Sequence, residues 1–339
     1  MSQLKFILQL IGLCIFWSIL FLATAWTFGA IYFDAPFPGV GNLCLALLWL
    51  VGLLVGFLRM RGKKRLLVWS GAFLLVMIPW LFKKPQNTRV WAPEFAHVPS
   101  AVINGDLVTF TNFRHFDYHA DGTPIEKWET HSFHLSKLRY MDFFMTYWGT
   151  GRLVGHPIFS FDFGDDGHVA FSIESRREKG EVYGLISGLY KQFELLYIVS
   201  DESDVIRSRT NFRKDENVYL YRLHIKETTT RLRFSEYVES LNRRAAEPAW
   251  YNVVTANCTT AVRGQITTRE RHSLDWRILA NGKLDELLNE RGILDKSMPF
   301  PELKAKSHIN PVAHKHPEPE KFSEVIRQGV PGFKVRYSP

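Results

Sequence analysis

Cysteine is scarce in this chain of 339 residues, and its three cysteines are unevenly placed. Cys14 and Cys44 lie in long apolar runs, so residues 83–339 hold a single thiol, Cys258. A lone cysteine cannot form a disulfide within its own domain, which excludes a disulfide-stapled fold. Cys258 is therefore a buried spectator, a partner for another chain, or a nucleophile.

The sequence also lacks the short motifs that are typical of cofactor and metal sites. It contains no glycine-rich phosphate loop, no dinucleotide-binding fingerprint and no Cys-x-x-Cys pair. Histidines that could bind a metal lack a supporting cysteine or acidic pattern; they are His115 and His119, and His308, His314 and His316 near the end of the chain. We therefore predict no cofactor and no metal.

The net charge of +8 owes much to basic clusters beside the apolar runs. This placement predicts a surface close to anionic lipid headgroups and no nucleic-acid partner. Arg207, Arg209 and Arg213 fit either a solvated loop or a contact with a phosphate headgroup.

Charge is absent from three apolar runs, residues 6–33, 43–58 and 66–82. Because a bilayer core takes roughly 20 apolar residues to cross, each run predicts a transmembrane helix, the second and third with help from their flanks. A cleaved signal peptide is the alternative for the first run. That run has no small-x-small cleavage site, so an uncleaved anchor is favoured.

The loops between these runs predict the orientation of the chain. Residues 59–65 (RMRGKKR) are densely basic and therefore cytoplasmic, whereas residues 34–42 carry no positive charge. Three crossings then place everything after residue 82 outside the cytoplasm, although Lys83, Lys84 and Arg89 argue weakly against it. We predict a multi-pass protein of the bacterial cytoplasmic (inner) membrane with a periplasmic C-terminal domain.

The rest of the chain mixes the periods of strands and helices. Alternating apolar residues predict strands at 106–113, 128–134, 156–163, 169–176, 193–199 and 218–225. Helical signals predict helices at 234–246, from Cys258 onward, and at 283–291. The predicted class is α+β. It comprises a membrane anchor (1–85), a periplasmic domain (86–297) and a Pro- and His-rich extension (298–339) that wraps the surface.

The residues around Cys258 favour a nucleophile. Asn257 is a preferred helix N-cap, so Cys258 would occupy the first position of a helix. The positive end of a helix dipole and its amide donors favour a thiolate there. The same amides can form part of an oxyanion hole, as in papain-like enzymes. The alternative is a small buried hydrophobe, which is what most free cysteines are.

A general base is predicted on the hairpin formed by residues 156–176, whose turn is residues 164–167 (GDDG). Alternation places the phenylalanines at 159, 161 and 163 on the core face, and His156 and Glu174 on the other face. Counting from the turn puts His156 opposite Glu174, and a carboxylate beside an imidazole orients it and raises its basicity. We predict His156 as the base and Glu174 as its partner. His168 is the competing base, and the alternative for Glu174 is a solvated charge run.

Three segments resemble the bacterial family named for the periplasmic domain of the lipoprotein N-acyltransferase Lnb. They are residues 155–161 (GHPIFSF), 170–176 (AFSIESR) and 257–260 (NCTT), within a resemblance that covers roughly residues 107–265. The resemblance implies a cysteine nucleophile at Cys258 and a histidine base at His156. It also implies a circularly permuted papain-like (NlpC-type) fold, because the histidine precedes the cysteine.

Three hypotheses of function follow. The first is a membrane-anchored thiol acyltransferase that moves an acyl chain from a lipid ester, through a Cys258 thioester, to an amine. Its partners would be a phospholipid or a lipoprotein, whose α-amine is the acceptor that the resemblance implies. The second is a cysteine hydrolase or peptidase of the cell envelope. The third is a non-catalytic binding module, in which Cys258 would lie buried away from His156.

Overall fold

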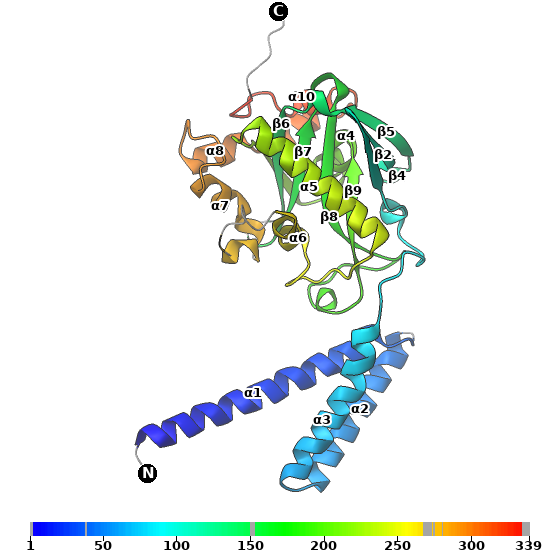
Figure 1. Cartoon of the computed structure of the whole chain (residues 1–339), viewed down its shortest axis with the longest axis vertical. Coiled ribbons are helices and arrows are strands. Elements are labelled where there is room, and N and C mark those ends of the chain that lie inside the picture. Colours follow the sequence, from blue (N-terminus) through cyan, green and yellow to red (C-terminus); the bar gives the residue numbers. More distant parts are fainter. Residues whose placement is uncertain are drawn as a thin grey trace, which may run out of the picture. The chain divides into compact units, whose positions relative to one another are not determined.

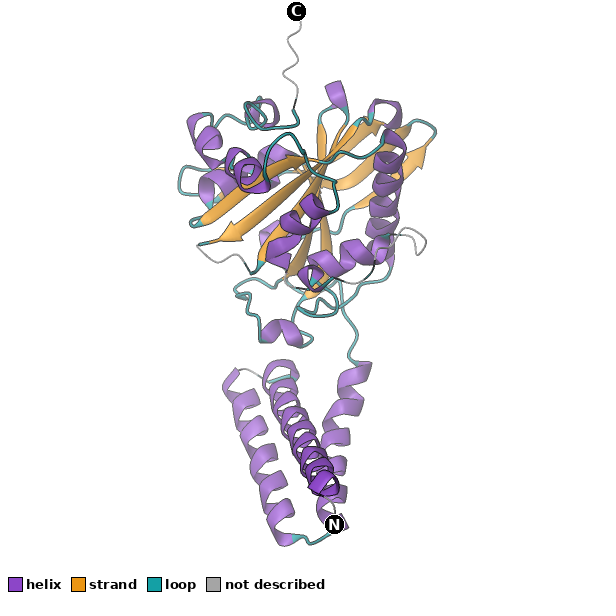
Figure 2. Cartoon of the chain, turned by 90° about the vertical axis from the view of Figure 1, so that its left-hand side faces the viewer, coloured by secondary structure: helices purple, strands orange, loops and turns teal. Residues whose placement is uncertain are grey.

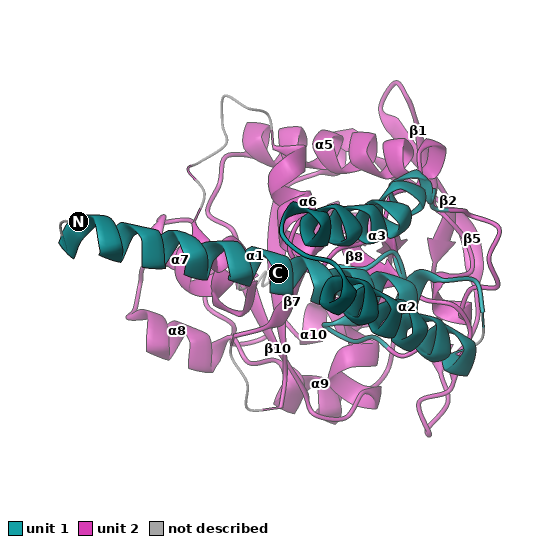
Figure 3. Cartoon of the chain, turned by 90° about the horizontal axis from the view of Figure 1, so that it is seen from below, with its two compact units in different colours: residues 1–85, 183–193 teal, residues 86–182, 194–339 magenta. Residues whose placement is uncertain are grey.

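The computed structural model describes residues 3–37, 39–149, 153–266, 273, 275–279 and 281–333. The chain forms two compact units, which Figure 3 distinguishes by colour. The first unit consists of residues 1–85 and 183–193, and the second of residues 86–182 and 194–339.

The first unit contains three long apolar helices (Figure 1): α1 (Gln3–Asp34), α2 (Gly39–Arg59) and α3 (Lys63–Phe82). All three are long and apolar enough to cross a membrane. The two shorter helices extend beyond their uncharged runs, as expected. Tryptophan donors join the helices, from Trp49 Nε1 to the Ala72 carbonyl (3.2 Å) and from Trp69 Nε1 to Thr24 Oγ1 (2.9 Å).

The second unit is built on a mixed eight-stranded sheet in the order β1-β2-β9-β8-β7-β6-β10, with β5 also paired to β2. The pairs are antiparallel except for β2 and β9. The strands are β1 (Ser100–Asn104), β2 (Leu107–Arg114), β5 (Trp128–His134), β6 (Tyr140–Trp148), β7 (Gly155–Asp162), β8 (His168–Arg176), β9 (Glu194–Ser200) and β10 (Glu216–Arg222). A separate pair joins β3 (Asp117–Tyr118) and β4 (Pro124–Ile125).

Helices lie on both faces of this sheet (Figure 2). On one face α5 (Glu227–Ala246) packs Phe234 and Tyr237 against Phe161 and Phe171. The same face carries α6 (Cys258–Gln265), α7 (Leu284–Glu290) and α8 (Phe300–Lys306). The other face is covered by α4 (Glu202–Val205), α9 (Asn310–Lys315) and α10 (Phe322–Val325).

The described part of the C-terminal segment supplies buried residues to that second face. Its composition predicts a surface wrap, yet Ile309, Ala313, Phe322 and Ile326 are all buried. They pack in one cluster with Phe144, Ile158 and Ala170 of the central strands. The segment therefore completes the core of the second unit as well as lying on its outside.

The structure confirms the α+β class and the predicted hairpin. β7 and β8 are joined by a turn in which Gly164 and Gly167 both have positive φ, a conformation that glycine adopts without strain. The sequence pattern did not reveal β6, which lies between β7 and β10. Seven consecutive residues of β6 are buried, so the strand lacks the alternation by which a half-exposed strand is found.

Candidate active site

Cys258 is the first residue of α6, as predicted, and is 5% exposed. Asn257 Oδ1 accepts hydrogen bonds from the amides of Thr259 (3.0 Å) and Thr260 (2.9 Å). In return Thr260 Oγ1 accepts from the Asn257 amide (2.8 Å), which completes a capping box. This cap fixes the start of the helix at the sulfur-bearing residue. The Asn257 side chain accepts from the amides of the second and third helical residues, Thr259 and Thr260, and not from the amide of Cys258.

His156 lies on β7 just beyond the part of the strand that pairs with β8, because that pairing ends at Ile158 and Ser172. Alternation places its ring on the face opposite Phe159, whereas Cys258 packs in the Phe159 cluster. Where the strands part, the thiol of Cys258 lies close enough to the imidazole to raise the pKa of His156. The structure thus brings together His156 and Cys258, which are 102 residues apart in the sequence.

Glu174 lies beside His156, as the hairpin register predicts. Its Oε1 is 3.2 Å from His156 Nε2, and Ser172 Oγ stands between them, 2.8 Å from Nε2 and 2.6 Å from the carboxylate. Nε2 is thus the ring nitrogen that faces Ser172 and Glu174. The carboxylate and the hydroxyl therefore fix the orientation of the ring.

Burial alone would lower the pKa of His156. The negative charge of Glu174, together with hydrogen bonding by Cys258 and Glu174, outweighs burial and the opposing charge of Arg209, so the pKa of His156 is raised to about 9. Burial alone would raise the pKa of Glu174, but the charges of His156 and Arg209 hold it well below its usual range. The site therefore favours an imidazolium and a carboxylate around neutral pH.

The raised pKa of His156 predicts that the fold weakens as pH rises. Below about pH 6.5 the histidine is protonated in both the folded and unfolded states, so its contribution is fully present. Between about 6.5 and 9 only the folded state keeps the proton, and the free energy of unfolding should fall by up to about 1.4 kcal/mol per pH unit. The thermal midpoint of the purified protein across this range measures the effect.

His156→Gln should flatten that dependence, whereas replacing the exposed His119 by glutamine should not. Equal slopes in the wild type and in His156→Gln would show that another group carries the titration.

Arg209 joins Glu174 to a second carboxylate beneath the site. It lies in the π-helical turn η5 (Ser208–Phe212), with its side chain 2% exposed, 2.9 Å from Glu174 Oε1 and 3.0 Å from Glu216 Oε2. Glu216 also accepts from Trp148 Nε1 (3.0 Å), and the Trp148 ring lies 6.5 Å from the His156 ring. Arg209 is thus neither a solvated residue nor a headgroup contact. It is a buried counter-ion that holds Glu174 in place.

Asn281 is a site residue that the sequence reasoning missed. Its Nδ2 donates to Cys258 Sγ (3.3 Å), and its Oδ1 accepts from the Gly155 amide (3.0 Å). One side chain therefore links the residue before His156 to the thiol. A Cβ at Gly155 would lie 2.9 Å from the Thr146 carbonyl and 2.1 Å from Met145 Cε, so only glycine fits this junction. The Asn281-Gly282 pair is a turn signal, but it does not say where the chain returns.

His168, the competing base, lies at the far end of β8 from Glu174. Its Nε2 is 3.9 Å from Asp162 Oδ1. With Asp142 and Glu202 it forms a group of metal-ligand type within the described residues, whose ligand atoms lie within 4.8 Å of one another. Arg327 already bridges the two carboxylates, at 2.7 Å from each. This group is a neutralised ion-pair cluster, remote from the thiol.

The fold and this site define a membrane-anchored α+β domain with a buried, hydrogen-bonded cysteine and histidine. Residues 125–282 match the family described as the Lnb N-terminal periplasmic domain. The matched segment contains Cys258, His156, Glu174 and Asn281. No curated protein and no solved structure matches the chain. Three membrane spans followed by a periplasmic domain place the protein in the bacterial cytoplasmic membrane, with its C-terminal domain in the periplasm.

Proposed function

We propose that this protein is a membrane-anchored thiol acyltransferase with Cys258 as nucleophile and His156 as general acid and base. The observation that carries the proposal is the proximity of His156 to Cys258 at the start of α6, with Glu174 and Ser172 bonded to the histidine and Asn281 bonded to the thiol. A nucleophile within reach of a base that a third group orients is the arrangement that covalent catalysis requires. The order of histidine before cysteine supports a circularly permuted papain-like topology.

In the first half-reaction the Cys258 thiolate attacks the carbonyl carbon of a lipid acyl ester. The negative charge that develops on the carbonyl oxygen would be stabilised by the Cys258 amide and by Asn281 Nδ2. The ester C–O bond then breaks, the imidazolium of His156 gives its proton to the departing alkoxide, and a thioester and a lipid alcohol result.

In the second half-reaction an amine attacks the thioester carbonyl. Neutral His156 takes a proton from the attacking nitrogen, the C–S bond breaks, and an amide forms while the thiolate and imidazolium are restored. We infer that the acceptor is the α-amine of a lipoprotein. A hydrolase would use the same residues, but water would attack the thioester in place of the amine.

Apolar side chains around the site support a lipid as the acyl donor. Trp148 (43% exposed), Leu153 (64%), Trp276 (58%) and Leu279 (46%) all project into solvent. Hydrogen bonds tie the segments of three of them to the site: the Leu153 carbonyl accepts from the Gly282 amide (3.1 Å), and the Ile278 carbonyl accepts from Thr259 Oγ1 (2.7 Å). Exposed apolar groups gathered at one place mark a surface for an apolar ligand.

The decisive experiment uses the full chain in detergent with a phospholipid that carries an alkyne on its acyl chain. The wild type should acquire a tag that neutral hydroxylamine removes, and Cys258→Ser should not. Cys44→Ser is the matched control, because Cys44 is an exposed thiol of α2. A tag that persists in Cys258→Ser would sink the proposal. A diacylglyceryl-cysteine peptide added next should take up the tag as a stable amide, whereas a hydrolase would release only the free fatty acid.

Asn281→Ala should slow formation of the thioester by about 10²- to 10³-fold, as expected for the loss of one oxyanion donor. The measurement is the rate of tagging in a single turnover. Asn289→Ala, on the nearby helix α7, is the control and should leave the rate unchanged. A normal rate in Asn281→Ala would remove this residue from the mechanism.

A further inference from the structure

The loop between β8 and β9 has an apolar tip that carries no charged residue. Residues 182–189 read VYGLISGL. Val182 is 84% exposed, Leu185 54% and Ile186 67%, and a short 3-10 helix, η4 (Ser187–Leu189), follows them. Large aliphatic side chains exposed in a row are unusual for a loop in water and mark a surface that another apolar phase covers.

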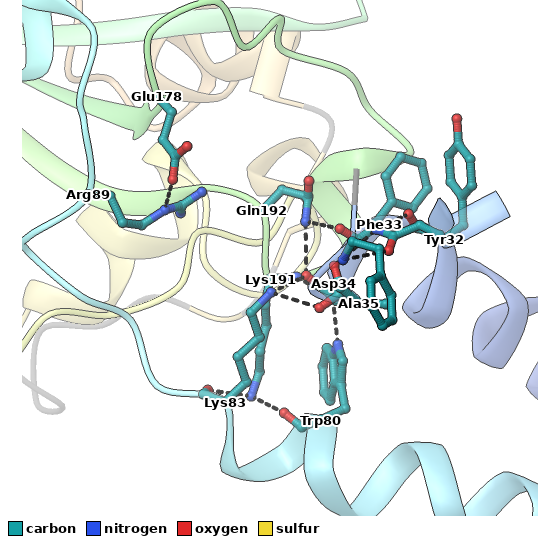
Figure 4. A network of polar contacts seen from close by, with 12 residues as sticks. Tyr32, Phe33, Asp34, Ala35, Trp80, Lys83, Arg89, Glu178, Lys191 and Gln192 are labelled. Atoms are coloured by element: carbon teal, nitrogen blue, oxygen red, sulfur yellow. Dashed lines mark hydrogen bonds and ion pairs between the residues drawn. The ribbon is translucent and has the colours of Figure 1, made fainter. Parts of the chain in front are cut away.

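The residues that follow this tip are bonded to the ends of the membrane helices, within the first unit (Figure 4). The Lys191 amide donates to Asp34 Oδ2 (3.1 Å), and Lys191 Nζ donates to the carbonyls of Trp80 (2.6 Å) and Lys83 (3.0 Å). Gln192 Nε2 donates to the Phe33 carbonyl (2.6 Å). These bonds bring side-chain and backbone donors of residues 191–192 to the ends of α1 and α3, where carbonyls run short of amides from the helix itself.

An aromatic contact fixes the loop more closely still. The Tyr190 ring stacks on Phe33 with a centroid distance of 5.0 Å. It also lies against Gly29, where a Cβ would fall 1.9 Å from the tyrosine hydroxyl. A glycine in α1 thus makes room for the loop one turn before the helix ends.

The helix ends that hold the loop have the residues of a membrane boundary. Trp80 donates to Asp34 Oδ2 (2.7 Å), and Lys83 Nζ lies 2.9 Å from Asp34 Oδ1. Tryptophan and lysine at the end of an apolar helix are typical of the interface between hydrocarbon and water. Because Tyr190 and Lys191 are bound at this level, the uncharged tip a few residues earlier is confined to the same interface.

We propose that residues 182–189 insert into the outer leaflet of the membrane that α1, α2 and α3 cross. Leu185 and Ile186 lie among the lipid acyl chains, and the polar network of Asp34, Lys191 and Gln192 holds the base of the loop at the headgroup level. The loop leads directly into β9 and follows β8, the strand that carries Ser172 and Glu174. The domain thereby has a second attachment to the membrane besides the connection after α3.

The test places a nitroxide spin label on the full chain in vesicles of phosphatidylethanolamine and phosphatidylglycerol. Cys14, Cys44 and Cys258 are replaced by serine, and Ile186→Cys provides the single labelling site. Collisions with oxygen and with a water-soluble nickel chelate are measured. The label at residue 186 should show several-fold more collisions with oxygen than with nickel, relative to Asp165→Cys.

Asp165 is the matched control because it is exposed, charged and in the turn at the opposite end of β8, roughly 30 Å along the strand from the loop. Equal accessibility of the two labels to nickel would overturn the proposal. Spin–spin broadening at residue 186 that disappears on dilution with unlabelled protein would also overturn it, and would place a second copy of the chain on the loop.

Discussion

Replacing His156 by alanine is expected to slow thioester formation at neutral pH by at least about 10⁴-fold, as for other nucleophile–base pairs. The substitution removes the cation next to the sulfur and the proton donor to the departing alcohol in one step. The measurement is the single-turnover rate of tagging with the alkyne phospholipid. Such a loss corresponds to about 5.5 kcal/mol of activation free energy.

His168→Gln is the control that separates the two histidines considered from the sequence. His168 lies by Asp162 and the Asp142–Glu202 cluster and does not face the thiol, so its replacement should leave the rate nearly unchanged. If His168→Gln lost activity as completely as His156→Ala while remaining folded, the assignment of the base would be wrong.

Replacing Arg209 by methionine is expected to destabilise the periplasmic domain by about 3–5 kcal/mol. Glu174 and Glu216 would remain buried without the guanidinium that lies 2.9 and 3.0 Å from them. A loss of this size lowers the thermal midpoint by about 6–20 °C in a domain of this length. Circular dichroism or differential scanning fluorimetry on the detergent-purified protein measures it.

Arg209→Lys should recover only part of the loss, because an ammonium cannot span two carboxylates as a planar guanidinium does. Arg213→Met is the matched control. Its side chain is 39% exposed and 3.7 Å from Glu216, so its loss should cost less than about 1 kcal/mol. Equal decreases of the thermal midpoint in Arg209→Met and Arg213→Met would show that the buried ion pairs of Arg209 stabilise the domain no more than an exposed pair does.

The sequence predicts those features of the site that depend on residues close together in the chain, namely a hairpin register and a helix cap. The turn at 164–167 sets the register of one hairpin, and that register alone brings His156 opposite Glu174. The cap at Asn257 is equally local, because its partners, Thr259 and Thr260, follow it by two and three residues. Cys258 itself was found because it is the only thiol of its domain.

The rest of the site depends on where distant segments return. Arg209 follows Glu174 by 35 residues and Asn281 follows Cys258 by 23, and neither carries a local pattern that names its partner. β6 was missed because burial on both faces removes the alternation of a strand. A polar composition likewise concealed the five buried apolar residues by which the C-terminal segment covers the sheet.

The helices α9 and α10, which cover one face of the sheet, are among the last segments of the domain to be synthesised. Phe322 follows the end of β8 by roughly 150 residues, which takes about 8–30 s to synthesise at about 5–20 residues per second. During this interval the face that carries Phe144 and Ile158 lacks α9 and α10. The core on this face can therefore be completed only after these C-terminal helices have been made. A chain shortened at residue 297 should be digested by added protease under conditions in which the full chain resists.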